Sequence, residues 1–206
     1  MEEKDTYKTI TTASEEVLFK DRNSKFFGYA FPVQNEEAVK QHIEDLKKQH
    51  HTARHWCYAY QIGTDKNNLS YRANDDGEPN NSAGMPIYGQ IQSFDVTNIL
   101  IVVVRYFGGI KLGVGGLINA YRTGAQMALE ASKIIEKTIN VDYCIAFEYK
   151  NMNKVMRIIK EKNLKITNQV LEMECKVFLS VRKKESEMVF DIFNNQFEIN
   201  IKEVSL

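Results

Sequence analysis

The stretch Asn98–Gly116, NILIVVVRYFGGIKLGVGG, decides how the first part of this chain folds. Its first half, Asn98–Phe107, is a nearly continuous apolar run that contains one arginine, and such a run is typical of a strand buried on both faces of a sheet. Glycines follow, and from Val114 to Leu129 the apolar residues recur at helical spacing. The order of strand, glycine-rich loop and helix predicts an α/β fold.

Glycine and proline divide the chain into two parts. All eleven Gly and all three Pro lie between Gly28 and Gly124, and none follows. Because these residues mark unusual backbone turns, the second part is expected to consist of regular elements with short connections. We therefore expect two domains, residues 1–136 and 137–206.

The second part has the pattern of six regular elements. Strand-like and helical periodicities alternate in the order β-α-β-β-α-β, which is the ferredoxin-like split βαβ arrangement with two helices on one face of an antiparallel sheet. The expected elements are Val141–Tyr149, Met152–Lys162, Leu164–Val170, Met173–Arg182, Glu185–Phe193 and Phe197–Val204.

Composition narrows the class of protein. The chain has a formal net charge of +0, which argues against a protein wrapped all over in nucleic acid but is compatible with a local basic patch. The three cysteines are far apart, so reduced thiols in the cytoplasm are expected rather than a disulfide framework. The polar start MEEKDTYKTI is unlike a secretory signal, and no apolar run is long enough to span a membrane.

The glycine-rich loop Gly108–Gly116 has two interpretations. In the first interpretation, the loop binds an anion or a phosphate group through its glycine backbone, the N-terminus of the following helix and the charge of Lys111. The other is a tight strand-to-helix turn against a crowded sheet. Neither a Walker A loop nor a dinucleotide fingerprint fits, since Gly-Lys-Ser/Thr is missing and Ile118 replaces a glycine. The residues in question are Gly108, Gly109, Lys111, Gly113, Gly115 and Gly116.

An acidic loop, DDGEP, precedes this region and carries Asp75, Asp76 and Glu78. Such carboxylates can hold Mg²⁺, act as acid and base, or cap the next helix, although a solvated turn is the commoner case. Arg105, in a buried strand, needs a negative partner, and we expect Asp75 or Asp76. All three carboxylates are expected near Arg105 and Lys111.

Other polar groups are weaker candidates. His51, His55 and Cys57 lack a fourth ligand, so we expect no metal there. In the second part, a helix and its flank carry a row of basic residues that is either an RNA face or, more commonly, the solvated side of an amphipathic helix. These residues are Lys150, Lys154, Arg157 and Lys160.

The chain resembles the YigZ/IMPACT family over roughly Tyr7–Lys133. The resemblance rests on four stretches in order, SKFFGYAFPV, ARHWCYAYQIG, DDGEPNNSAGMPI and VVVRYFGGIKLGVGGLINAY. Asn80, Asn81 and Ser82 depart from the usual pattern, as do Lys25 and Trp56. The positions that match the family motifs are His55, Cys57, Asp75, Asp76, Gly77, Glu78, Gly84, Arg105, Gly108, Gly109, Leu112, Gly113, Gly116 and Tyr121.

The resemblance implies a two-domain fold and a role in translation. It implies a first domain of the ribosomal-protein/RNase PH type, with helices on one side of a mixed sheet, and a tail similar to the last domain of elongation factor G, as in bacterial YigZ-type members. It also implies translational control, since eukaryotic relatives compete for the ribosome-associated activator of a starvation-sensing kinase.

Two functions remain open from the sequence. The favoured one is a regulatory or binding protein of the translation apparatus, with RNA, the ribosome or a translation factor as its partner and no cofactor. The alternative is a metal-dependent enzyme acting on nucleotides or phosphate esters, with the DDGEP carboxylates and Lys111 at its site. The sequence contains no recognisable nucleophile–base pair, so an enzyme is less favoured.

Overall fold

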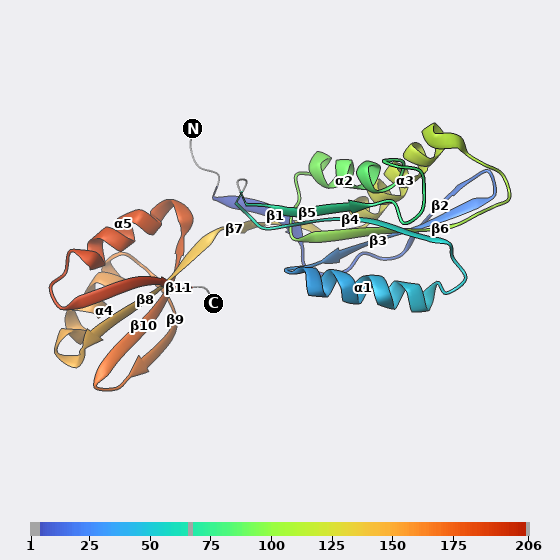
Figure 1. Ribbon diagram of the computed structural model, residues 1–206. Helices are drawn as coiled ribbons and strands as arrows, with labels where there is room; N and C mark the ends of the chain where they lie inside the picture. Colours follow the sequence, from blue (N-terminus) through green and yellow to red (C-terminus); the bar gives the residue numbers. More distant parts are fainter. Residues whose placement is uncertain (1–4, 66–67, 205–206) are drawn as a thin grey trace. The chain divides into compact units, whose positions relative to one another are not determined.

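The computed structural model describes residues 5–65 and 68–204, which fold as two compact units (Figure 1). One unit is Tyr7–Lys137, and the other begins at Thr138 and includes Asp5 and Thr6. We propose this division as the domain boundary. No helix within these two ranges is long and apolar enough to cross a membrane.

The Tyr7–Lys137 unit contains a five-stranded sheet in the order β2-β3-β6-β4-β5, and every pairing in it is antiparallel. Strands β1 and β7 form a separate two-stranded sheet. The elements of this unit are β1 (Thr6–Ile10), β2 (Val17–Asp21), β3 (Ser24–Pro32), α1 (Glu36–Gln49), β4 (His55–Ile62), β5 (Ser70–Asn74), α2 (Gly84–Ser93), β6 (Ile99–Tyr106), α3 (Gly113–Glu130) and β7 (Ile134–Thr138).

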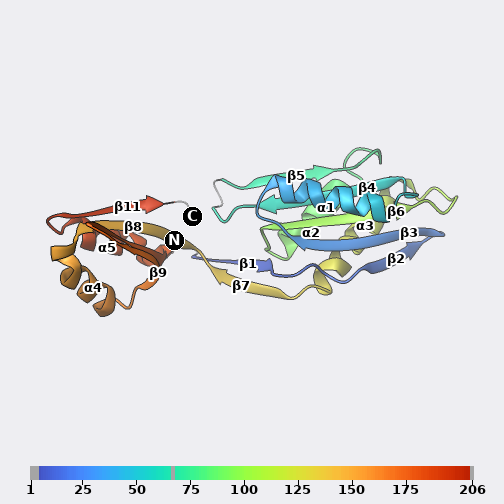
Figure 2. The ribbon, with the colours of Figure 1, turned by 90° about the horizontal axis from the view of Figure 1, so that it is seen from below.

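Strand β6 is the centre of this sheet and is buried on both faces, as predicted. Its residues Leu100, Val102 and Val104 belong to the cluster that contains the apolar face of α1. The alternate residues, Ile101 and Val103, belong to the cluster that contains α2 and α3. Figure 1 shows α1 on one side of the sheet and α2 and α3 on the other, and Figure 2 shows α1 in front of the strands.

The α/β class is confirmed, but two details of the expected sheet were wrong. The sheet is antiparallel rather than mixed, and helices cover both faces rather than one. The reason lies in β6 itself, because a strand that is apolar on both faces needs apolar cover on both. Helix α1 supplies the second cover, with Val39, Ile43 and Leu46 buried and Asn35 capping its start.

The second unit confirms the predicted order β-α-β-β-α-β. Its antiparallel sheet has the strand order β11-β8-β10-β9, and residues of both helices share one core with the sheet. The strongly amphipathic α4 buries Val155, Ile158 and Ile159. The elements are β8 (Asn140–Glu148), a short 3₁₀ segment (Tyr149–Asn151), α4 (Met152–Glu161), β9 (Lys165–Leu171), β10 (Glu174–Arg182), α5 (Lys183–Asn194) and β11 (Ile199–Val204).

We expect residues 138–206 to fold when expressed alone, because Ile145, Val177 and Phe193 are fully buried within one core of this unit. Circular dichroism during heating should show a cooperative transition. The same fragment with Val177→Asp, which places an unpaired charge in that core, should lose the transition. A broad, non-cooperative melt of the unaltered fragment would contradict the boundary.

Candidate functional site

A buried charge cluster joins three elements of the Tyr7–Lys137 unit. Arg105, at the end of β6, donates from Nη1 to Oε1 of Glu78 in the DDGEP loop over 2.6 Å. The hydroxyl of Tyr121, on α3, donates to the same Glu78 oxygen over 2.8 Å. Arg105 is 5% exposed, Glu78 9% and Tyr121 0%. Removing either charged partner would leave the other charge buried and unpaired.

The expected partner of Arg105 was therefore wrong, since Glu78 takes the place assigned to Asp75 or Asp76. The Arg105 guanidinium also lies 5.5 Å from the ring centroids of both Phe26 and Phe107. Its Nε has no hydrogen-bond partner within the part of the chain that the structure describes. The ring of Phe107, itself half exposed, is one of the two that contact this buried cation.

Asp75 and Asp76 bind backbone instead. Asp75 Oδ1 accepts from the N–H groups of Ala83 and Gly84 at the start of α2, and its Oδ2 accepts from Asn81. Asp75 thus caps the next helix, which is one of the roles that the sequence left open for the DDGEP carboxylates, and the Ser82 hydroxyl donates to the Pro79 carbonyl. Asp76 Oδ2 accepts from the N–H of Trp56 on β4.

Two further contacts hold the DDGEP loop against β4. Nδ1 of His55 lies 2.8 Å from the carbonyl oxygen of Asp76. Because a carbonyl oxygen can only accept a hydrogen bond, Nδ1 must carry the proton and donate it. The Cys57 thiol donates to the carbonyl of Asp75. Burial raises the pKa of Cys57 well above its usual range, so this thiol stays protonated and is not an activated nucleophile.

The three carboxylates do not converge on one point. Each accepts hydrogen bonds from different protein donors, and within residues 5–65 and 68–204 no three His, Cys, Asp or Glu side chains are placed to share a metal ion. Lys111 is exposed and makes no ion pair with any described residue, so its expected closeness to these carboxylates is not seen. The DDGEP loop therefore organises β4, α2 and β6.

The glycines of the glycine-rich loop differ in what requires them, either close packing or a positive φ angle. A Cβ on Gly108 would lie 2.1 Å from the backbone carbon of Asn23, and the Gly108 N–H donates to Ser24 Oγ, so the loop packs directly on the β2–β3 turn. Gly109 and Gly113 have φ of +86° and +75°, which favour glycine. At Gly116 a Cβ would meet Leu112, whereas at Gly115 it would meet nothing within 4 Å.

This packing creates an exposed surface that the sequence analysis missed, which we call the glycine-loop surface. Helix α3 starts there without a side-chain cap, and no acidic residue lies in its first turn. Phe107, Ile110 and Val114 are 48–53% exposed, although they are large and apolar. Figures 1 and 2 show the loop beside the β2–β3 turn. The surface comprises Arg22, Phe107, Ile110, Lys111 and Val114.

A usable sequence signal did exist for part of this surface. Phe107 and Ile110 fall within the glycine-rich loop, outside the helical and strand periods that assign apolar residues to a core. Arg22 carries no such signal, because only the contact of Gly108 with Asn23 brings its turn to the loop.

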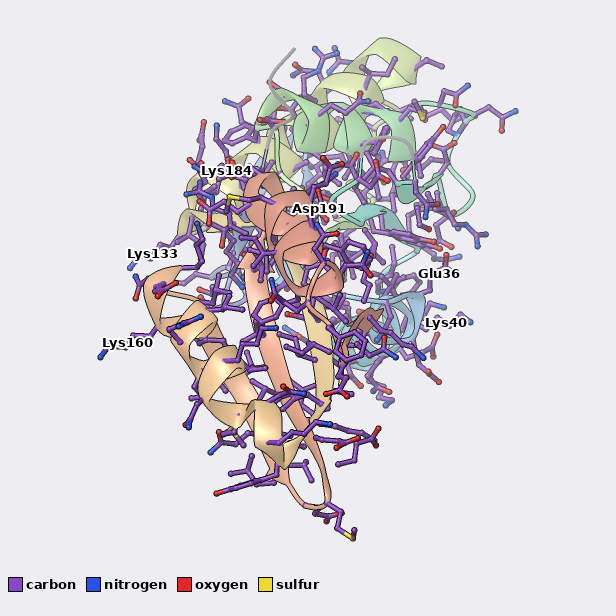
Figure 3. All side chains as sticks on the ribbon, turned by 90° about the vertical axis from the view of Figure 1, so that its left-hand side faces the viewer. Glu36, Lys40, Lys133, Lys160, Lys184 and Asp191 are labelled. Atoms are coloured by element: carbon purple, nitrogen blue, oxygen red, sulfur yellow. The ribbon has the colours of Figure 1, made fainter. Side chains whose placement is uncertain are left out.

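The basic residues of α4 and of the 3₁₀ segment before it belong to the second compact unit. Lys150 Nζ lies 3.2 Å from Glu148 Oε2 and 2.8 Å from Glu198 Oε2, and Arg157 Nε lies 3.8 Å from Glu161 Oε1. Lys154 is half-buried, and Lys160 extends away from the helix (Figure 3). Two of the four expected RNA contacts therefore already have carboxylate partners.

We expect Arg105→Ala to lower the free energy of unfolding by about 3–5 kcal/mol, because Glu78 would remain buried without its cation. Urea denaturation gives this value. Arg122→Ala, an exposed position on α3, is the matched control and should change it by less than about 0.5 kcal/mol. Equal effects of the two substitutions would show that the buried pair does not stabilise the fold.

Substitutions at a packed glycine and at an open one should change the free energy of unfolding by different amounts. Gly108→Ala forces the loop off the β2–β3 turn and should cost about 1–3 kcal/mol of unfolding free energy. Gly115→Ala enters open space at a helical position and should cost nothing, with a gain of up to about 1 kcal/mol. Denaturation of both variants in parallel tests this, and a neutral Gly108→Ala would refute the packing.

Comparison with known proteins places the chain in a family. The family model of the Impact N-terminal domain matches residues 22–129, which include the DDGEP loop, β6 and most of α3. The chain is 33% identical to IMPACT family member YigZ of Escherichia coli over 77% of this chain and 78% of that protein. It is 30% identical to IMPACT family member YvyE of Bacillus subtilis over 97% of this chain and 93% of that protein.

A solved structure agrees over nearly the full length. The crystal structure of a hypothetical protein matches with a TM-score of 0.71 and 26% identity, and covers 98% of both chains. The family model and the two relatives show that the chain belongs to the IMPACT family.

Proposed function

We propose that this chain is a cytoplasmic, translation-linked regulatory protein that binds RNA, as free RNA or on the ribosome, through its glycine-loop surface. Membership of the IMPACT family supports the link to translation, since the family resemblance implies translational control. The observation that carries the proposal is the packing of Gly108 on the β2–β3 turn, because it sets the turn that carries Arg22 beside the loop that carries Lys111 and exposed apolar side chains.

The chemistry of this surface suits nucleic acid. The N–H groups at the start of α3, which has no side-chain cap, and the charge of Lys111 attract phosphate oxygens. The exposed ring of Phe107 offers a face on which a base can stack, a contact worth about 1–3 kcal/mol per base. A basic surface with an exposed aromatic ring fits single-stranded or looped RNA better than a duplex, whose bases are already stacked.

The second unit has a smaller part in this proposal. Its tail is similar, by family resemblance, to the last domain of elongation factor G. Lys154 and Lys160 are its remaining candidate phosphate contacts, because Lys150 and Arg157 are paired with glutamates. We therefore assign the main contact to the glycine loop.

The enzyme hypothesis receives less support from the contacts at the DDGEP loop. Asp75, Asp76 and Glu78 each accept hydrogen bonds from protein donors, and the Cys57 thiol remains protonated because burial raises its pKa. These contacts favour binding over turnover.

We expect co-sedimentation with ribosomes, or binding to a single-stranded RNA, to weaken steeply as salt rises, because phosphate contacts release counterions. Lys111→Ala and Arg22→Ala should each reduce the salt slope by about one unit, and Phe107→Ser should lower affinity without changing the slope. Lys133→Ala, an exposed lysine just beyond the far end of α3, is the control. Salt-independent binding, or none, would refute the proposal.

A further inference from the structure

One end of the second unit is formed by three turns that come together through strand register. Glu148 pairs with Glu174, which places the end of β8 beside the start of β10. Phe147 pairs with Ile199, which adds the start of β11. Figure 1 shows these turns together at one end of the unit. We call this end the apolar tip, and its turns are 148–152, 171–174 and 195–199.

The tip exposes more apolar surface than its fold requires. Met173 is 96% exposed, Phe197 82%, Tyr149 69% and Leu171 52%. Each residue comes from one of the three turns, so together they cover one end of the unit. The core beneath them is complete, with residues such as Val155 and Phe193 fully buried. A group of large exposed apolar side chains on a packed domain marks an interaction surface.

The rim of the tip is acidic. Its turns carry four glutamates, Glu148, Glu172, Glu174 and Glu198, and one lysine. Lys150 is held between Glu148 and Glu198, and Lys176 on β10 lies with its Nζ 3.3 Å from Glu174 Oε2. Four glutamates therefore face two lysines, and the rim keeps an excess of negative charge. A surface depression of about 380 Å³ lies between the strands and is lined by Phe147, Glu148, Glu174, Glu198 and Ile199. Its lining combines apolar residues with three glutamates, which suits the long side chain of a lysine or arginine.

We propose that the apolar tip docks a basic, amphipathic segment of a partner protein. Apolar side chains of that segment pack on Tyr149, Met173 and Phe197, and one of its lysine or arginine side chains enters the depression between Glu148, Glu174 and Glu198. Complementary charge decides between occupants. Nucleic acid and anionic membranes would meet the acidic rim with like charge, and a second copy would set glutamates against glutamates.

This surface is distinct from the glycine-loop surface, and the proposal goes beyond the proposed function. It assigns Lys150 to the support of the tip rather than to RNA, because its ammonium group links the end of β8 to the start of β11. Partner protein and RNA would then bind different units of the chain, and loss of one would leave the other.

The test uses the full chain and a fluorescent peptide of about 18 residues, five helical turns, built from leucine and lysine at amphipathic spacing. Fluorescence anisotropy should show binding that weakens with salt, and a matched peptide with glutamate in place of lysine should not bind. Met173→Ser with Phe197→Ser should weaken binding about tenfold through lost apolar burial. Glu174→Gln with Glu198→Gln should weaken binding and flatten its salt dependence.

Met188→Ser is the matched control, because Met188 is 48% exposed on α5 and lies outside the tip. Thermal unfolding of the serine variants should be unchanged, since Met173, Phe197 and Met188 are exposed. The glutamine variant should change little, because its lost ion pairs with Lys150 and Lys176 are solvent-exposed. Equal binding by the double serine variant and the unaltered chain would overturn the proposal. So would equal binding of the glutamate peptide, or binding of phosphatidylserine vesicles or a single-stranded oligonucleotide that is lost on substitution of the tip.

Discussion

The arrangement of the Tyr7–Lys137 unit depends on one buried positive charge, the guanidinium group of Arg105. Arg105 is almost fully buried at the end of the central strand, and such a cation is tolerated only with a paired, hydrogen-bonded anion. Glu78 supplies that anion, and Tyr121 satisfies the same carboxylate from α3. The pair therefore determines where the DDGEP loop lies and where α3 packs on the sheet.

The rest of the loop follows from this anchor. With Glu78 held inward, Asp75 reaches the first N–H groups of α2 and Asp76 reaches the backbone of β4. One short acidic segment thus orders a helix, a strand and a buried cation. Its residues resemble a catalytic or metal-binding motif in the sequence, yet each carboxylate is used to hold the fold.

The exposed apolar and charged side chains lie away from the DDGEP loop, and their charge differs between the two units. At the glycine-loop surface, apolar side chains accompany Arg22 and Lys111, and the helix end adds partial positive charge. At the apolar tip, side chains of similar character are surrounded by glutamates. In the two proposals, the apolar residues of each surface contribute contact area and the surrounding charge selects the ligand. A neutral chain can in this way hold one surface for polyanions and another for basic proteins.

Local pattern alone determined the strand β6, the helix α3 and the β-α-β-β-α-β order, because the periods of helices and strands are properties of neighbouring residues. The motif residues around DDGEP and GGIKLG were also identifiable from the sequence. Only the tertiary structure decided that Glu78 pairs with Arg105 and that Gly108 packs on the β2–β3 turn, since these contacts join residues 27 and about 84 positions apart. Residues so distant meet only after β6 has paired with β3 and β4, and the spacing of neighbouring residues does not encode such contacts.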